Sequence, residues 1–196
     1  MRLLLLADHA EPTLWEYLDR RKLEGVDLIL SCGDLPAEYL SFLTCFTHAP
    51  ILYVHGNHDE VYRDHPPEGC VCIDDDLYVY NGLRILGLGG SFRYRPGEHQ
   101  YTERQMRWRV FKLWPKLLKH KGFDILLAHA PAFGIGDDTD RAHRGFEIFV
   151  KLMDRYQPIA LVHGHVHQGY RFDFKHEREH GKTKVINAYG YYYLEI

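Results

Sequence analysis

The sequence lacks the long apolar stretches and paired cysteines that mark membrane-spanning or disulfide-rich secreted chains. No run approaches the roughly 18 apolar residues of a membrane span, and the run before Asp8 is too short for the hydrophobic region of a signal peptide. The four cysteines have no Cys-x-x-Cys spacing, so we expect reduced thiols and a cytoplasmic protein. The Cys70–Cys72 pair could bind a metal, but alternate positions of a strand are the interpretation that we favour.

An excess of positive charge is also absent. The formal net charge is −3 at pH 7, which argues against a broadly basic surface for nucleic acid or membrane. The chain has no repeats, low-complexity segments or linkers, so we expect one domain over residues 1–196. We therefore expect neither a membrane nor a nucleic acid as partner.

Histidine, by contrast, is abundant and grouped: the chain has 14. Such grouping favours metal or acid–base chemistry. The histidines lie in a pattern of apolar strands alternating with helices, which is typical of βαβ units and a parallel sheet. In the first half we expect strands over 2–7, 26–34 and 50–59 and helices over 11–25 and 36–49.

The second half predicts a hairpin first, because Asn81-Gly82 separates two β-rich runs within 76–92. A helix over 102–122 should be interrupted near Pro115. After it we expect a strand over 123–131, a helix over 146–157, a strand entering 158–169, and antiparallel strands in 170–196 around a turn at Gly181.

Polar side chains follow five of these strands, at the edge of the sheet where α/β proteins place their sites. Alone, each has a simpler explanation: Asp34 would cap a helix, and His129 would be a satisfied core histidine. Together they indicate a common partner, because buried polar groups without one are costly. Carboxylate, amide and imidazole ligands suit Mn²⁺, Fe²⁺ or Zn²⁺. The residues are Asp8, Asp34, Asn57, His58, Asp59, His129, His165 and His167, while His163 is expected to pack inside.

The motifs at these positions resemble the calcineurin-like metallophosphoesterase family. They are "GD" at 33–34, "GNHD" at 56–59, a lone histidine at 129 in "LLAHAP", and "GHVH" at 164–167. The resemblance implies an α/β fold, a four-layer αββα sandwich with mixed sheets. It also implies hydrolysis of phosphoesters at a centre of two divalent ions (Mn, Fe or Zn), with Mn²⁺ expected to serve in vitro.

The resemblance also implies residue roles. Asp34 would bridge two metals, Asp8 and His167 would bind the first, and Asn57, His129 and His165 would bind the second. His58 would be the general acid, with Asp59 orienting its ring, while a bridging hydroxide attacks phosphorus.

The first motif departs from the family pattern Asp-x-His, because here it reads Asp8-His9-Ala10. A one-residue slip in an extended segment turns the side chain to the opposite side. Three arrangements follow: a bulge that returns His9 to the first metal, a weaker site of Asp8, Asp34 and His167 with waters, or an empty site. We favour the second. The third would make the chain a non-catalytic scaffold that binds a protein, as in degenerate members of the family.

The substrate is expected to be a small phosphodiester or phosphomonoester. Arg93 and Arg95 follow the hairpin and are candidates for phosphate contact, against the alternative of a solvated loop. The polar loop after His129 carries Asp137, Asp138, Asp140 and His143. These form either a further metal site or, as we favour, ordinary solvated loop residues.

Overall fold

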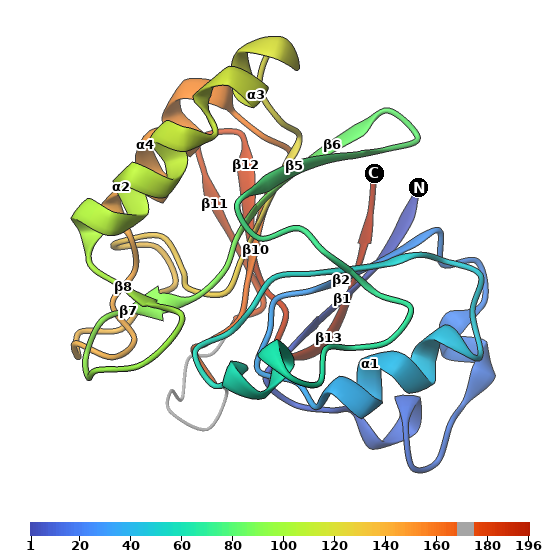
Figure 1. The fold of residues 1–196 in the computed structure, drawn as a ribbon. Helices are drawn as coiled ribbons and strands as arrows, with labels where there is room; N and C mark the ends of the chain where they lie inside the picture. The colour runs from blue at the N-terminus through green and yellow to red at the C-terminus, as the bar shows by residue number, and fades with distance from the viewer. Residues whose placement is uncertain (168–174) are drawn as a thin grey trace.

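The computed structural model describes residues 1–167 and 175–196 and contains two principal sheets (Figure 1). The five-stranded sheet has the order β13-β1-β2-β3-β4. Its strands are parallel except β13, which is antiparallel to β1. The bounds are β1 Arg2–Ala7, β2 Leu28–Ser31, β3 Ile51–Tyr53, β4 Val71–Cys72 and β13 Gly190–Glu195.

The six-stranded sheet has the order β11-β12-β10-β9-β6-β5. Its four central strands are parallel, and the edge strands β11 and β5 are antiparallel to their neighbours. The bounds are β5 Asp76–Tyr80, β6 Leu83–Leu88, β9 Ile125–Ala128, β10 Ala160–His163, β11 Glu177–His180 and β12 Thr183–Asn187. A separate two-stranded pair joins β7 Ser91–Phe92 to β8 Gln100–Tyr101.

The leucine run of β1 shows how the layers form. Leu3 and Leu5 belong to the core between the sheets, whereas Leu4 and Leu6 face the helical layer outside the five-stranded sheet. Since side chains alternate along a strand, a continuous apolar run is what a strand covered on both faces requires. The outer face of the six-stranded sheet carries its own helical layer, so the predicted four-layer αββα sandwich is confirmed.

The helices are α1 Ala37–Thr44, α2 Glu103–Lys112, α3 Trp114–Lys119 and α4 Glu147–Tyr156. In Figure 1, α1 packs below the five-stranded sheet and the other three pack outside the six-stranded sheet. The predicted interruption near Pro115 is confirmed, since α2 ends before it and α3 begins with it in the first turn.

The prediction of a helix over residues 11–25 is wrong. The segment instead forms two short 3₁₀ turns, η1 Pro12–Leu14 and η2 Arg20–Leu23. The Asp19 side chain accepts a hydrogen bond from the Arg21 amide, 3.2 Å away, and so caps the second turn where a continuous helix would pass through. A third 3₁₀ turn, η3 Glu60–Arg63, follows the "GNHD" segment.

The tail predicted as antiparallel strands around Gly181 forms β11 and β12, although residues 168–174 at its start lie outside the described part. The last strand, β13, instead crosses to the other sheet and pairs with β1. The two chain ends therefore lie side by side, and the Met1 ammonium donates to the Ile196 carbonyl. Among the described residues, no helix is long and apolar enough to cross a membrane.

Candidate metal centre

The carboxyl ends of strands from both sheets meet at one edge of the sandwich. In the five-stranded sheet β1, β2 and β3 are parallel neighbours, and Asp8, Asp34 and Asn57 follow them. In the six-stranded sheet β9 and β10 are parallel neighbours, and they are followed by His129 and His165. The topology therefore brings together side chains that are up to 157 positions apart in the chain.

His129 is the best-defined donor of this cluster. Its ring is fully buried, and its Nε2 lies 3.0 Å from Asn57 Oδ1 and 3.4 Å from Asp34 Oδ2. Its Nδ1 lies 2.9 Å from the Cys32 carbonyl, which fixes the Nδ1–H tautomer and turns Nε2 toward the two oxygens. Ligand atoms of Asp34, His129 and His165 all lie within 4.8 Å of one another.

His165 is oriented in a corresponding way, because its Nε2 lies 2.8 Å from the Ala142 carbonyl. Because Nε2 carries the hydrogen that the carbonyl accepts, the lone pair of Nδ1 remains available to a metal ion. Burial lowers the pKa of His165 to about 3, so the ring is neutral, as a metal ligand must be. Its ring lies 4.8 Å from that of His129, tilted by 56°.

The charges in the cluster leave room for a cation. Burial by itself lowers the pKa of His129, but the facing Asp34 carboxylate raises it to about 9. Burial by itself raises the pKa of Asp34, yet His129 and the His58 amide hold it below its usual range. A protonated His129 thus neutralises Asp34. A divalent ion between these donors would supply that charge instead, so the donor set fits a metal.

Asp8 contacts the segment that carries His165 and His167. Its side chain is completely buried, and its two oxygens accept from the His165 amide at 2.9 and 3.1 Å. His167 Nε2 lies 3.5 Å from the same carboxylate. Asp8, Asp34 and His167 line a cavity of about 320 Å³, together with His58.

The glycines of the two histidine motifs are explained by these carboxylates. A Cβ at Gly56 would stand 2.0 Å from Asp34 Oδ1, and a Cβ at Gly164 would stand 2.4 Å from Asp8 Oδ2. Only glycine lets the backbone approach the carboxylates so closely. The motif glycines are thus packing requirements of the centre.

Three residues of the centre have left-handed backbone conformations. The φ values are 61° for Asp8, 56° for Asp34 and 67° for His165. Such conformations cost a non-glycine residue about 1–3 kcal/mol each and cluster at functional sites. Here each of them follows a strand, and Asp8 and Asp34 line the cavity described above.

His58 and Asp59 have different surroundings. The His58 side chain is exposed at the cavity, and its amide donates to Asp34 Oδ1 at 2.8 Å. Asp59 is buried, and its Oδ2 accepts from the amides of Gly56 and Asp34 at 2.7 and 2.9 Å. Burial, with Asp34 nearby, raises the pKa of Asp59 to about 6. Within the described residues, both hydrogen bonds of Asp59 hold the loop backbone and none reaches the His58 ring.

His9 does not join the donors around Asp8. Its exposed ring stacks on Tyr189, with centroids 5.9 Å apart and planes 17° apart. The ring of His167 packs on the same Tyr189, 5.1 Å away. Ala10 packs with the core beneath the five-stranded sheet. Tyr189 is a contact of the centre that no sequence motif indicated.

Tyr94, between the two candidate arginines, connects them to the centre. Its hydroxyl lies 3.5 Å from Asn57 Nδ2. Tyr94, Arg93 and Arg95 line a cavity of about 430 Å³ with Arg141, which comes from the loop after His129.

The carboxylates of the loop after His129 are used by the loop itself. Asp140 Oδ1 accepts from the amides of Ala142 and His143, and Asp137 Oδ2 accepts from the Gly145 amide. His143 Nδ1 lies 2.8 Å from Asp140 Oδ2. In the described residues these side chains are not among the groups that could hold a metal. His163 is 1% exposed, as expected, and burial lowers its pKa to about 4.

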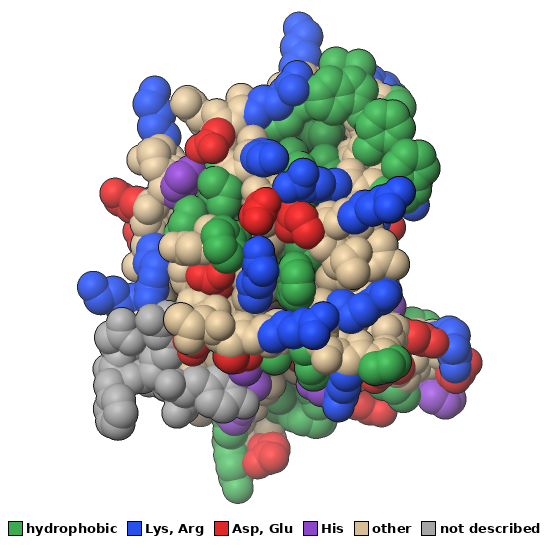
Figure 2. Space-filling view, turned by 90° about the vertical axis from the view of Figure 1, so that its left-hand side faces the viewer, with side chains coloured by type: hydrophobic (Ala, Val, Ile, Leu, Met, Phe, Trp, Pro, Cys, Tyr) green, Lys and Arg blue, Asp and Glu red, His purple; other side chains and the backbone are tan. Residues whose placement is uncertain are grey.

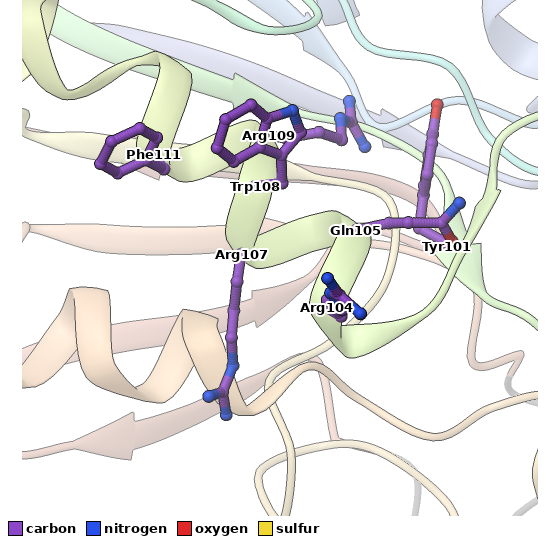
Figure 3. A pocket seen from close by; sticks show the side chains of 7 residues that line it. All are labelled: Tyr101, Arg104, Gln105, Arg107, Trp108, Arg109 and Phe111. Carbon is purple, nitrogen blue, oxygen red and sulfur yellow. The ribbon is translucent and has the colours of Figure 1, made fainter.

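A larger hollow lies away from the centre, on the outer face of α2. It measures about 720 Å³ and is lined by residues such as Trp108, Phe111 and Arg104 (Figure 3). Figure 2, which views the side of the molecule that carries α2, shows hydrophobic side chains gathered beside Lys and Arg side chains. None of the residues that line the hollow is a donor of the centre.

Comparison with known proteins places this geometry in a family. The model of the calcineurin-like phosphoesterases matches residues 1–169. The chain belongs to this family. Family membership and the donor cluster together support a metal-dependent phosphoesterase in general. No curated protein matches the sequence.

Solved structures with little sequence similarity share the fold of this chain. One has a TM-score of 0.69 at 15% identity, covering 98% of this chain and 94% of that chain. TT1561 of Thermus thermophilus has a TM-score of 0.63 at 18% identity, with 95% and 88% covered. GAP50 of Plasmodium, described as the anchor in the inner membrane complex, has a TM-score of 0.57 at 12% identity, with 95% and 70% covered.

Proposed function

We propose that this chain hydrolyses a small phosphodiester or phosphomonoester at a centre of two divalent metal ions. The observation that carries the proposal is the convergence of His129 Nε2, Asn57 Oδ1 and Asp34 Oδ2 beside the cavity that His58 lines. Asn57, His129 and His165 would hold one ion, Asp8 and His167 the other, and Asp34 both. Bound divalent ions supply Lewis-acid chemistry, lowering the pKa of water and neutralising phosphoryl oxygens.

The protein's own groups then have distinct tasks. His58 would donate a proton to the departing oxygen. This role is supported by its side chain, which is exposed at the cavity, and by its backbone amide, which Asp34 holds. Asp59 supports it by holding the loop amides. Arg93 and Arg95 are candidates for orienting the phosphate, since their cavity adjoins Asn57 through Tyr94.

The experiment is a metal titration of the chelator-treated protein. Hydrolysis of a bis-aryl phosphodiester and an aryl phosphomonoester is measured as Mn²⁺ is added. We expect turnover that saturates with metal, with a second, weaker step if the first site lacks the ligand missing at Ala10. His58→Asn should lower kcat by about 10²–10⁴-fold, whereas His65→Asn, at an exposed histidine outside the cavity, should not.

The second candidate is a non-catalytic scaffold that binds a protein partner. Two observations favour it: the His9 ring lies on Tyr189 in the motif that departs from the family pattern, and a protein described as an anchor shares the fold. No turnover of either ester at saturating Mn²⁺, from a folded protein that binds one ion or none, would favour the scaffold over the enzyme.

A further inference from the structure

A second group of metal-ligating side chains lies outside the centre described above. It consists of His55, Asp74 and His99, whose ligand atoms all lie within 4.8 Å of one another. His55 lies two residues beyond β3, Asp74 two residues beyond β4, and His99 just before β8. The group therefore joins three segments that approach only in the folded chain.

Cys72 lies beside this group, outside the three residues whose ligand atoms are all within 4.8 Å of one another. His55 Nδ1 lies 2.6 Å from Asp74 Oδ2 and 3.9 Å from Cys72 Sγ. Ligand atoms of tetrahedral zinc, at 2.0–2.3 Å from the ion, lie roughly 3.3–3.6 Å apart. The first distance is shorter and the second longer than this range, and the ring planes of His55 and His99 are 5° apart. The exposed Cys72 side chain and the two rings would therefore rotate to meet a common ion.

The surroundings hold the carboxylate in place. Asp74 Oδ1 accepts from the Gly89 amide at 2.5 Å and from Arg109 Nη2 at 3.2 Å, while Oδ2 faces His55. Hydrogen bonds of this kind orient ligands in metal sites. The side chains of His55 and Asp74 are only 17% and 15% exposed, which limits competition from water.

An ion pair between His55 and Asp74 would account for the positions of these two residues, but not for those of His99 and Cys72. The His99 ring stacks on His55, with centroids 4.4 Å apart and planes 5° apart. Within residues 1–167 and 175–196, the ring has no hydrogen-bond partner. His99 is also held at φ 52°, a conformation that costs a non-glycine residue about 1–3 kcal/mol. A pair of His55 and Asp74 would require neither this residue nor a thiol.

We propose that His55, Asp74, His99 and Cys72 bind one zinc ion. Two imidazoles, a carboxylate and a thiolate are a donor set that zinc accepts in tetrahedral geometry. Because the His55 carbonyl also accepts from the Gly90 amide, at 2.7 Å, the ion would fasten the loop that carries Asn57 to the segment that carries Tyr94. The site is structural and does not depend on the proposed phosphoesterase activity.

The thiolate gives the test a specific signal. The full chain is stripped with a chelator, kept reduced and titrated with Co²⁺. Cysteine ligation produces a sulfur-to-cobalt charge-transfer band in the near ultraviolet, which the oxygen and nitrogen donors of the other centre cannot produce. We expect a band that saturates at one thiolate-bound cobalt per chain and disappears in Cys72→Ser.

Matched variants decide the outcome. The band should persist in Cys45→Ser, at another exposed free cysteine, and in Asp34→Asn, which removes a donor of the other centre. His99→Gln should weaken zinc binding by roughly tenfold or more in competition with a chromophoric chelator. No band in the folded wild-type chain, or a band retained in Cys72→Ser, would overturn the proposal. Loss of ester hydrolysis with the band intact would count against the phosphoesterase function alone.

Discussion

Substitutions of Asp59 are expected to separate support of the loop from action on the His58 ring. Both hydrogen bonds of the carboxylate end on Oδ2, which accepts from the amides of Gly56 and Asp34. Asp59→Ala leaves both donors without a partner in a buried place. At about 1.5–3 kcal/mol for each bond to a charged group, the variant should lose about 3–6 kcal/mol of unfolding free energy. Asp59→Asn keeps one oxygen for both donors and should lose about 1–2 kcal/mol.

The assay is urea denaturation of the chelator-treated protein, which removes any stabilisation by bound metal. Ester hydrolysis at saturating Mn²⁺ is measured in parallel. Asp64→Ala is the control, because the Asp64 side chain is 69% exposed, so its loss should change stability by less than about 0.5 kcal/mol. The reasoning fails if Asp59→Asn and Asp59→Ala leave stability unchanged while kcat falls equally in both. That result would assign Asp59 to orienting the His58 ring.

Three further substitutions test the fold and its charges. Gly56→Ala places a Cβ 2.0 Å from Asp34 Oδ1, so it should lose at least about 2 kcal/mol in urea denaturation and weaken Mn²⁺ binding; wild-type values for both would contradict the packing argument. Leu5→Ala, in the core between the sheets, should lose about 2–5 kcal/mol, and a loss below about 1 kcal/mol would show that the site collapses without a cavity. Asp124→Asn tests a pH dependence: Arg84 binds the carboxylate and lowers its pKa, so the stabilisation is present above about pH 4 and is lost as pH falls through the folded-state pKa. The difference in urea midpoint between wild type and Asp124→Asn should therefore shrink from about pH 6 to about pH 3, and a constant difference would refute the pair's role.

Local sequence chemistry was sufficient for much of the framework. The apolar runs predicted strands, Asn81-Gly82 predicted the hairpin that joins β5 and β6, and Pro115 predicted the break between α2 and α3. These three predictions are confirmed because the backbone conformation of each segment depends on residues that are neighbours in the sequence. The segment 11–25 failed for the complementary reason. Its composition suits a helix, but the capping side chain of Asp19 and the burial of Leu14 and Leu23 favour two separate turns.

The motifs predicted which residues would lie at the candidate centre, since each follows a strand and parallel strands end at a common edge. Their orientation was decided only by the tertiary structure. The carbonyl of Cys32 orients the ring of His129, and Tyr94 approaches Asn57 from the loop between β7 and β8. Neither contact has a local signature, because both join segments that are distant in sequence and depend on how the two sheets pack.

The same division holds for the group around His55. In the sequence, His55 stands directly before the "GNHD" motif. Cys70 and Cys72 were predicted to be alternate residues of a strand, and β4 contains Cys72 but not Cys70. Only the packing of β4 and the segment before β8 against the end of β3 brought Cys72, Asp74 and His99 to His55. Sequence thus determines which side chains are available and the local conformation of each segment. The tertiary structure determines which of them share a site, because burial between two sheets fixes distances that no sequence spacing encodes.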